Sequence, residues 1–239
     1  MDSMEVSVVV TVLVLAVVQS VFGVGLLVFG TPTLLLLGYP FDQVLAYLLP
    51  CSILISALQV RASGGVRLDP LRRRFLLLTA PTVLAGTLTA LLILGKVNVR
   101  PLVGAMLIVT AFLRLGGARE RLYAFVRRRL DPLLVGLGVL HGLTNLGGGV
   151  LTVIVSSLYE DKHRVRAEIA FCYGLMGLIQ LATLAATTSV NWSPLLPLVA
   201  ATAYAAVGRY AFQAVGGPAY QYGLTGLIGG YGAALLLTA

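Results

Sequence analysis

Two glycine-rich stretches hold the residues best suited to bind a small ligand. Residues 22–33 read FGVGLLVFGTPT, and residues 141–152 read HGLTNLGGGVLT. A shift of 119 positions superimposes glycines and final threonines: Gly23 on Gly142, Gly30 on Gly149 and Thr33 on Thr152. Because glycine and proline interrupt helices, each stretch predicts two helical half-spans that meet at a break.

A helix that begins inside a membrane presents unbonded backbone amides and the positive end of its dipole, and both favour a small anion. Glycines let an oxyanion approach the backbone, while threonine and asparagine add side-chain hydrogen bonds. The alternative is that the glycines only let helices pack closely. The predicted substrate-binding residues are Gly23, Gly25, Gly30, Thr31 and Thr33 in the first break, and His141, Thr144, Asn145, Gly147, Gly148 and Gly149 in the second.

Five polar or thiol side chains near the breaks have two interpretations each. His141 can carry a proton or bind the anion, or it can be a neutral histidine bonded to a neighbouring helix. Cys51 and Cys172 can line a pathway, or fill space as small apolar residues. Gln59 and Gln180 can line the pathway, or form hydrogen bonds between helices.

Enzymatic chemistry finds no support in the sequence. The apolar segments hold no carboxylate pair, no cluster of metal ligands and no Ser-His-Asp arrangement, so we expect no catalytic residue, metal or cofactor. The net charge of +8 does not predict nucleic-acid binding, because the basic residues lie in short loops between apolar runs. Their role in orienting the chain in a membrane explains them better.

Composition places the chain in a lipid bilayer. Of 239 residues, 58% are hydrophobic and only 11% are charged, against roughly a quarter in soluble domains. Several apolar runs approach the ~20 residues of a spanning helix, and backbone groups in lipid must be bonded within their own segment. We therefore expect an all-α integral membrane protein.

The apolar runs predict the elements that position the breaks. Residues 5–37 would form a helix of ~50 Å, too long for a hydrocarbon core of ~30 Å, so we expect two pieces, 5–22 and 33–38. Further helices are expected at 43–60, 75–94 and 101–113, with a short helix on the headgroups within 114–131. In the second half we expect a broken segment at 132–158, a charged turn at 160–166, and helices at 167–187, 193–215 and 218–237.

The two halves of the chain resemble each other. An offset of 121 superimposes Ala46 on Ala167, Cys51 on Cys172 and Gln59 on Gln180. This match predicts an internal duplication, with a first transmembrane repeat at 1–113, a basic linker at 114–131 and a second repeat at 132–239.

The distribution of basic residues decides how the repeats are oriented. Five arginines lie in 61–74, six in 114–131, and a third cluster lies in 160–166. If each broken stretch enters and returns, each half has five segments, the halves are inverted, and all three clusters lie in the cytoplasm with the N-terminus outside. If each stretch crosses once, the third cluster is placed outside. We therefore expect inverted repeats, whose paired breaks mark a transporter's binding site near the midplane.

These motifs resemble the TauE/SafE sulfite exporter-like family. The resemblance rests on GVG at 23–25, GTP at 30–32, LLLLG at 34–38, and the second-half counterpart formed by HG at 141–142 and GGG at 147–149. Leu26 and Leu27 stand where many relatives have further glycine. The resemblance implies a permease of the bacterial or archaeal inner membrane that moves sulfite, sulfonates or related sulfur-containing organic anions, often outward.

We therefore expect a secondary transporter, working as an exporter by alternating access, which binds such an anion near the midplane between the two breaks. The expected partners are that anion and the lipid bilayer. A coupling proton or ion and a homodimer stay open. The alternatives are an anion channel and a non-transporting membrane scaffold or intramembrane enzyme.

Overall fold

The computed structural model describes residues 3–65, 69–92, 104–105, 107–108, 112, 119–214 and 217–237. The helix predicted at 101–113 lies largely outside these residues. Every regular element in the described part is helical. The elements before the linker are α1 (Ser3–Phe22), α2 (Leu26–Leu36), α3 (Phe41–Ala62), α4 (Pro70–Arg74), the π-helical turn η1 (Phe75–Thr79) and α5 (Ala80–Leu92).

The later elements begin with a short basic helix in the predicted linker and continue with the second half. They are α7 (Arg119–Arg128), α8 (Leu130–Thr144), α9 (Gly147–Leu158), α10 (Lys162–Thr187), α11 (Leu195–Ala203), the π-helical turn η3 (Tyr204–Gly208), α12 (Arg209–Ala214) and α13 (Gly217–Leu237). Among the described residues, four continuous helices are long and apolar enough to cross a membrane: Phe41–Ala62, Pro70–Leu92, Lys162–Thr187 and Leu195–Ala214.

Three predicted boundaries were wrong. The second piece of the first stretch begins at Leu26 and not at 33, so Gly30, Thr31 and Pro32 lie inside α2. Helical pairing of the backbone outweighs one missing proline donor where lipid offers no other partner. The three glycines at 147–149 form the first turn of α9, so the break itself is at Asn145 and Leu146. The predicted charged turn is helical from Lys162, because Asp161 caps α10 by accepting from the Arg164 amide at 2.8 Å.

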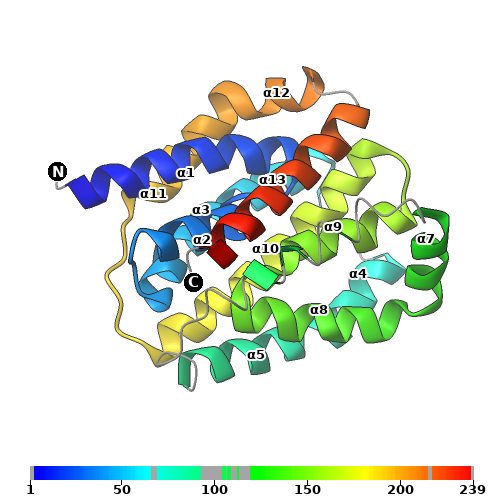
Figure 1. Ribbon diagram of the computed structural model, residues 1–239, viewed down its shortest axis with the longest axis horizontal. Coiled ribbons are helices and arrows are strands. Elements are labelled where there is room, and N and C mark those ends of the chain that lie inside the picture. Colours follow the sequence, from blue (N-terminus) through cyan, green and yellow to red (C-terminus); the bar gives the residue numbers. More distant parts are fainter. Residues whose placement is uncertain are drawn as a thin grey trace.

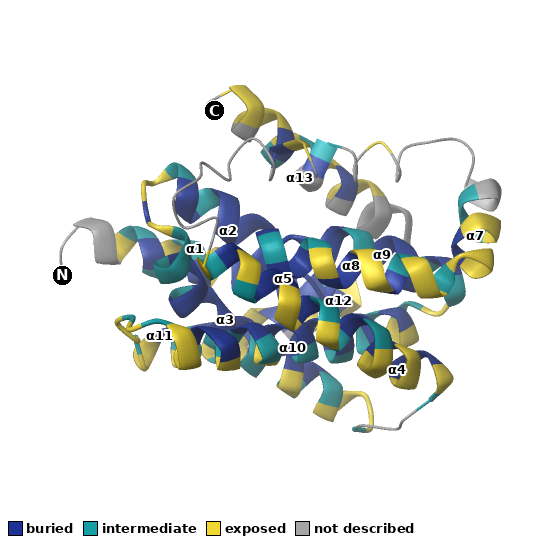
Figure 2. Ribbon diagram, turned by 90° about the horizontal axis from the view of Figure 1, so that it is seen from below, coloured by how far each residue is buried: buried dark blue, intermediate teal, exposed yellow. Residues whose placement is uncertain are grey.

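The helices form a bundle whose long axes run mainly along one direction (Figure 1). Helices α3 and α10 lie antiparallel at its centre, with Gly174 against Ser56 and Gly177 against Ile53. Helices α5 and α8 lie side by side and run parallel, and α1 lies against α11 and α12. The outward faces carry exposed apolar side chains such as Leu77, Leu198 and Val14, as expected of a bundle in lipid (Figure 2).

Most basic residues with described side chains gather at one end of the bundle, which we call the basic end. Three contacts tie its segments together: Arg72 with Glu168 at 2.9 Å, Arg74 with Asp131 at 3.1 Å, and Arg127 with the Ser157 carbonyl oxygen at 3.1 Å. At the opposite end, the Gln43 side chain donates to the Asn191 carbonyl oxygen at 3.1 Å. Both α4 and α7 lie at the basic end, away from the N-terminus (Figure 1).

Because α5 and α8 approach closely, adding one methyl group to α8 at their contact should lower the stability of the protein. A Cβ atom at Gly142 would lie 2.5 Å from the Val83 carbonyl oxygen, whereas a Cβ atom at Gly136, in the same helix, would meet nothing within 4 Å. We expect Gly142→Ala to lower the free energy of unfolding by about 1–3 kcal/mol through overpacking. Gly136→Ala should be neutral or stabilising, by up to about 1 kcal/mol, because alanine favours the helix.

Thermal or SDS unfolding of the two variants in detergent measures this difference. Equal stability of the two variants would mean that the α5–α8 contact is looser than described.

Candidate functional site

Each broken stretch folds into an antiparallel helical hairpin. In the first, α1 and α2 approach so closely that a Cβ atom at Gly25 would lie 2.6 Å from the Gln19 amide nitrogen. Gly23 has a φ of 78° at this turn, a conformation that favours glycine. In the second, Asn145 has a φ of 62°, and Gly147 packs against the His141 side chain. Asparagine is among the few non-glycine residues that tolerate this left-handed backbone.

The hairpins open toward opposite ends of the bundle. Arg127, just before α8, bonds Ser157 near the end of α9, so both ends of the second hairpin lie at the basic end. In the first hairpin, α2 leads into the start of α3, where Gln43 reaches Asn191 at the other end. The N-terminus also lies at that end (Figure 1).

The two hairpins contact each other in the core. The Asn145 side-chain amide donates to the Thr31 hydroxyl at 2.8 Å, across 114 positions of sequence. Gly148 lies against α2 and α10, since a Cβ atom there would lie 2.6 Å from Val28 Cγ2 and 2.7 Å from Tyr173 Cε2. Because these surfaces are closely packed, only glycine fits at 148.

Protein side chains bond several amides at the start of each second half-helix. The Leu26 amide donates to Gln19 Oε1 at 3.3 Å, and the Val28 amide donates to the Tyr173 hydroxyl at 3.1 Å. Equivalent bonds serve the second break. They run from the Gly147 amide to His141 Nδ1 at 3.1 Å and from the Leu146 amide to the Thr144 hydroxyl at 3.2 Å. The prediction of unbonded amides is therefore wrong at these four positions, because neutral side chains already accept from them.

The carbonyl ends of the first half-helices are bonded by a matched pair of glutamines. Gln59 Nε2 donates to the Gln19 carbonyl oxygen at 3.0 Å and to that of Ser20 at 3.3 Å. Gln180 Nε2 donates to the His141 carbonyl oxygen at 3.1 Å. Gln59 and Gln180 are the residues that the 121-position offset superimposes, so the halves use the same side chain for the same purpose.

Unbonded polar atoms gather mainly around the second break. Within the described part of the chain, the fully buried side-chain atoms without a hydrogen-bond partner are His141 Nε2, Asn145 Oδ1, Thr87 Oγ1, Gln59 Oε1 and Gln180 Oε1. Because the Gly147 amide donates to His141 Nδ1, a neutral imidazole carries its proton on Nε2. His141 therefore holds a buried N–H donor that the protein leaves unused.

The Asn145 side chain can offer either group to a ligand. Its amide nitrogen donates to Thr31 in the orientation described, which leaves Oδ1 free. A hydroxyl both donates and accepts, so a half-turn of the amide would keep the bond to Thr31 and present the NH₂ group instead.

Some predicted residues lie away from this contact. Thr33 bonds the Phe29 carbonyl oxygen and Tyr231 in α13, while Gly30 packs against the Leu48 side chain. The Cys51 thiol donates to the Tyr47 carbonyl oxygen and is buried, as is Cys172. Gly149 continues α9 by bonding the Leu146 carbonyl oxygen at 3.4 Å.

Sequence reasoning missed Gln19, Tyr173 and Thr87. Gln19 lies one turn before the Gly23 break, and Tyr173 directly follows Cys172. A polar residue one turn before a glycine break in an apolar run is a signal for a cap, and it was available for Gln19. Tyr173 could be found only from the packing of α10 on both hairpins, which one sequence does not give.

Comparison with known proteins gives one match. A family model described as "Sulfite exporter TauE/SafE" matches residues 8–235 of the chain. No curated protein and no solved structure matches it.

The bond between the hairpins can be measured by a double-mutant cycle. Asn145→Gly removes the amide but keeps the left-handed backbone, and Thr31→Val removes the hydroxyl. We expect a coupling of about 0.5–1.5 kcal/mol in the free energy of unfolding, the range for one intramolecular hydrogen bond.

Thr202→Val is the matched control, because this exposed hydroxyl bonds the Leu198 carbonyl oxygen within its own helix. Its effect should add to that of Asn145→Gly within about 0.5 kcal/mol. Additivity in the Asn145 and Thr31 pair as well would contradict the contact between the breaks.

Proposed function

The chain belongs to the sulfite exporter TauE/SafE family, and on this premise we propose that it moves small sulfur-containing anions through a site between its two hairpin tips. Members of this family are membrane transporters and not enzymes, so the alternative of an intramembrane enzyme is excluded. The proposed substrates are sulfite, sulfonates and related organosulfur carboxylates.

The observation that carries the proposal is the contact of the two breaks around unused polar atoms. Asn145 meets Thr31 at 2.8 Å, and the free Nε2 of His141 lies one turn before Asn145 in the same hairpin. A buried polar atom without a partner costs about 1–3 kcal/mol. A site that binds a ligand explains why such atoms lie unbonded in the core.

An anion would form stronger hydrogen bonds with the amides of this site than the side chains that now accept from them. The caps from Gln19, Tyr173 and His141 are neutral acceptors, and hydrogen bonds to charged groups are roughly twice as strong as neutral ones. The oxygens of a sulfite or sulfonate group can therefore replace one of these caps at the positive end of a half-helix.

Binding requires the hairpins to move apart, because the packing at Gly148 leaves no room for a side chain. This requirement favours alternating access, in which the hairpin of one repeat separates from the other. We propose that the repeats are inverted, so that separation can open the site first to one end of the bundle and then to the other.

Orientation is the first test of this scheme. We propose that the protein lies in the inner membrane with the basic end in the cytoplasm, since basic loops are retained there. Cysteines introduced singly as Gly64→Cys and Lys162→Cys should react with an impermeant thiol reagent only after the cytoplasmic side is exposed. Asn191→Cys should react from outside, whereas the native Cys51 and Cys172 are buried and serve as the background. Labelling of positions 64 and 191 from the same side would exclude this arrangement.

Transport itself is tested in proteoliposomes loaded with sulfite or a short sulfonate. We expect uptake of labelled anion to be accelerated by unlabelled anion inside, because a carrier exchanges substrate. With the membrane potential held at zero by valinomycin and equal potassium on both sides, a channel would not show this acceleration. Absence of flux with every such anion, in protein that elutes as a single folded species, would overturn the proposal.

Two substitutions of His141 distinguish the roles of its two ring nitrogens. His141→Asn can retain an acceptor near Nδ1 for the Gly147 amide but supplies no donor near Nε2, whereas His141→Gln can supply that donor. If Nε2–H binds the anion, His141→Asn should weaken substrate affinity by about 10- to 100-fold, the value of one hydrogen bond to a charge. His141→Gln should retain more of the affinity. The opposite ranking would assign His141 only to capping α9.

A further inference from the structure

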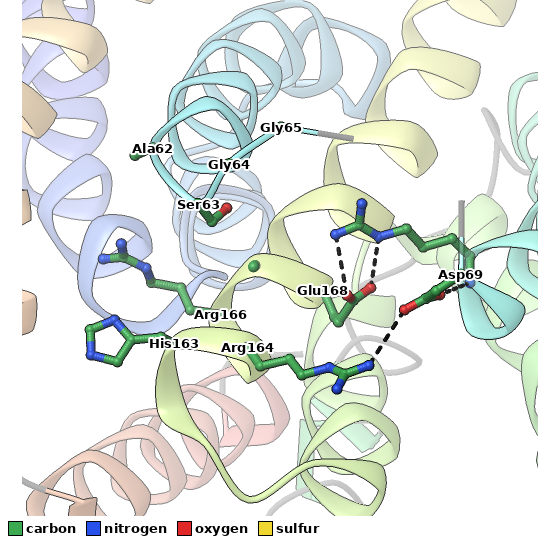
Figure 3. A pocket seen from close by; sticks show the side chains of 11 residues that line it. Ala62, Ser63, Gly64, Gly65, Asp69, His163, Arg164, Arg166 and Glu168 are labelled. Atoms are coloured by element: carbon green, nitrogen blue, oxygen red, sulfur yellow. Dashed lines mark hydrogen bonds and ion pairs between the residues drawn. The ribbon is translucent and has the colours of Figure 1, made fainter. Parts of the chain in front are cut away.

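A second polar region lies at the basic end, outside the contact of the hairpin tips. It is a cavity of about 670 Å³ between the end of α3, Asp69, Arg72 and the first turns of α10 (Figure 3). Its charged lining residues are Asp69, Arg72, His163, Arg164, Arg166 and Glu168. None of these belongs to the predicted binding residues.

Positive groups outnumber negative groups in the lining of this cavity. Arg72 pairs with Glu168 through two bonds, at 2.9 and 3.2 Å, and both side chains are buried. Arg164 approaches Asp69 only to 3.8 Å. With Arg166, three guanidinium groups face two carboxylates, so the cavity has a positive net charge even when His163 is neutral.

Arg166 connects the cavity to the first hairpin. In Figure 3 its side chain points toward α1, and its guanidinium donates to the Ser20 carbonyl oxygen at 3.4 Å. The same guanidinium lies 3.6 Å from the centre of the Phe212 ring. A Cβ atom at Gly23 would lie 3.5 Å from Arg166 Cγ, so the stem of this arginine lies against the tip of the first hairpin.

The residues that make this cavity cationic are not repeated at the matching positions of the first half. Under the offset of 121 that superimposes Gln59 on Gln180, the counterparts of His163, Arg164 and Arg166 are Asp42, Gln43 and Leu45. The positive charge of the cavity is therefore not a by-product of the duplication.

We propose that this cavity is the mouth through which the anion enters from the basic end. Arg164 and Arg166 select negative charge there, and Arg166 passes the anion to the tip of the first hairpin. The inference rests on the proposed transport function. A cationic cleft with low-dielectric walls raises the local concentration and arrival rate of anions by about 10- to 1,000-fold. Such a mouth would favour collection of anions from the basic end.

Thiol reagents of opposite charge test the mouth without relying on transport. Ser63 lines the cavity and is exposed, so Ser63→Cys places a small thiol in it. The measured quantity is the ratio of the reaction rate of a negatively charged methanethiosulfonate to that of a positively charged one. We expect this ratio to be about 10-fold higher at position 63 than for a free thiol in solution. The product of the negatively charged reagent leaves a sulfonate in the cavity and should block anion flux, and a short alkylsulfonate, which does not react with the reagent, should slow the reaction.

The cations are assigned by adding a second change to Ser63→Cys. Arg166→Gln and, separately, Arg164→Gln should each reduce the preference for the anionic reagent by about threefold or more. Arg128→Gln is the matched control: it removes the same charge from the same end, but Arg128 is exposed, lies in α7 and does not line this cavity. It should leave the preference unchanged within experimental error.

The two proposals fail in different ways. Equal rates for the two reagents, or an equal loss with Arg128→Gln, would overturn the mouth even if the wild-type protein carries sulfite. A thiol at position 63 that is fully modified without loss of flux would overturn it as well. A wild-type protein that carries no sulfur-containing anion would overturn the transport function, and with it the role of the cavity as an entrance.

Discussion

The need to satisfy backbone groups where a helix stops inside lipid shapes this molecule. A break leaves amides on one side and carbonyl oxygens on the other, and the hydrocarbon core provides no water for either. Here Gln19, Tyr173, His141 and Thr144 accept from amides at the breaks, while Gln59 and Gln180 donate to the carbonyl ends. Since Tyr173, Gln59 and Gln180 come from α3 and α10, these two central helices fix both hairpins in place.

The same bonds explain why the two halves of the chain keep matching residues at an offset. Gln59 and Gln180 differ in their immediate neighbours, yet each donates to a carbonyl oxygen in the last turn of the first helix of the hairpin in its own half. The halves differ in what accepts from the amides, since α2 uses Gln19 and the second half uses His141 and Thr144. Two of the five unbonded atoms, His141 Nε2 and Asn145 Oδ1, belong to the second hairpin, and none belongs to the first. The first hairpin contributes Thr31 and a closely fitting surface.

Much of the fold could be predicted from the sequence, because lipid leaves few choices. Charge-free runs predict helices, and the glycines at 23 and 25 and the polar pair at 144–145 predict where they stop. The family was also identified correctly from these motifs. Exact boundaries were harder, since Pro32 and the glycines at 147–149 are poor helix formers that tertiary packing keeps helical. The prediction that the glycine-rich breaks hold open amides was wrong at four positions. Gln19, His141 and Thr144 accept from three of these amides and precede them in the same hairpin, whereas Tyr173 comes from a helix distant in sequence.

A capped amide can exchange its hydrogen-bond partner between a protein side chain and an anion, whereas an open amide has no partner when the anion is absent. In the alternating access that we propose, the empty protein must also pass between its two orientations, and an amide left open in lipid would oppose this step. Neutral caps remove that cost when the site is empty, and a charged oxygen can still displace them because its hydrogen bonds are stronger. The binding free energy then includes only the difference between the amide's hydrogen bond to the anion and its hydrogen bond to the cap. A modest affinity of this kind suits a carrier, which must release its anion as readily as it binds it.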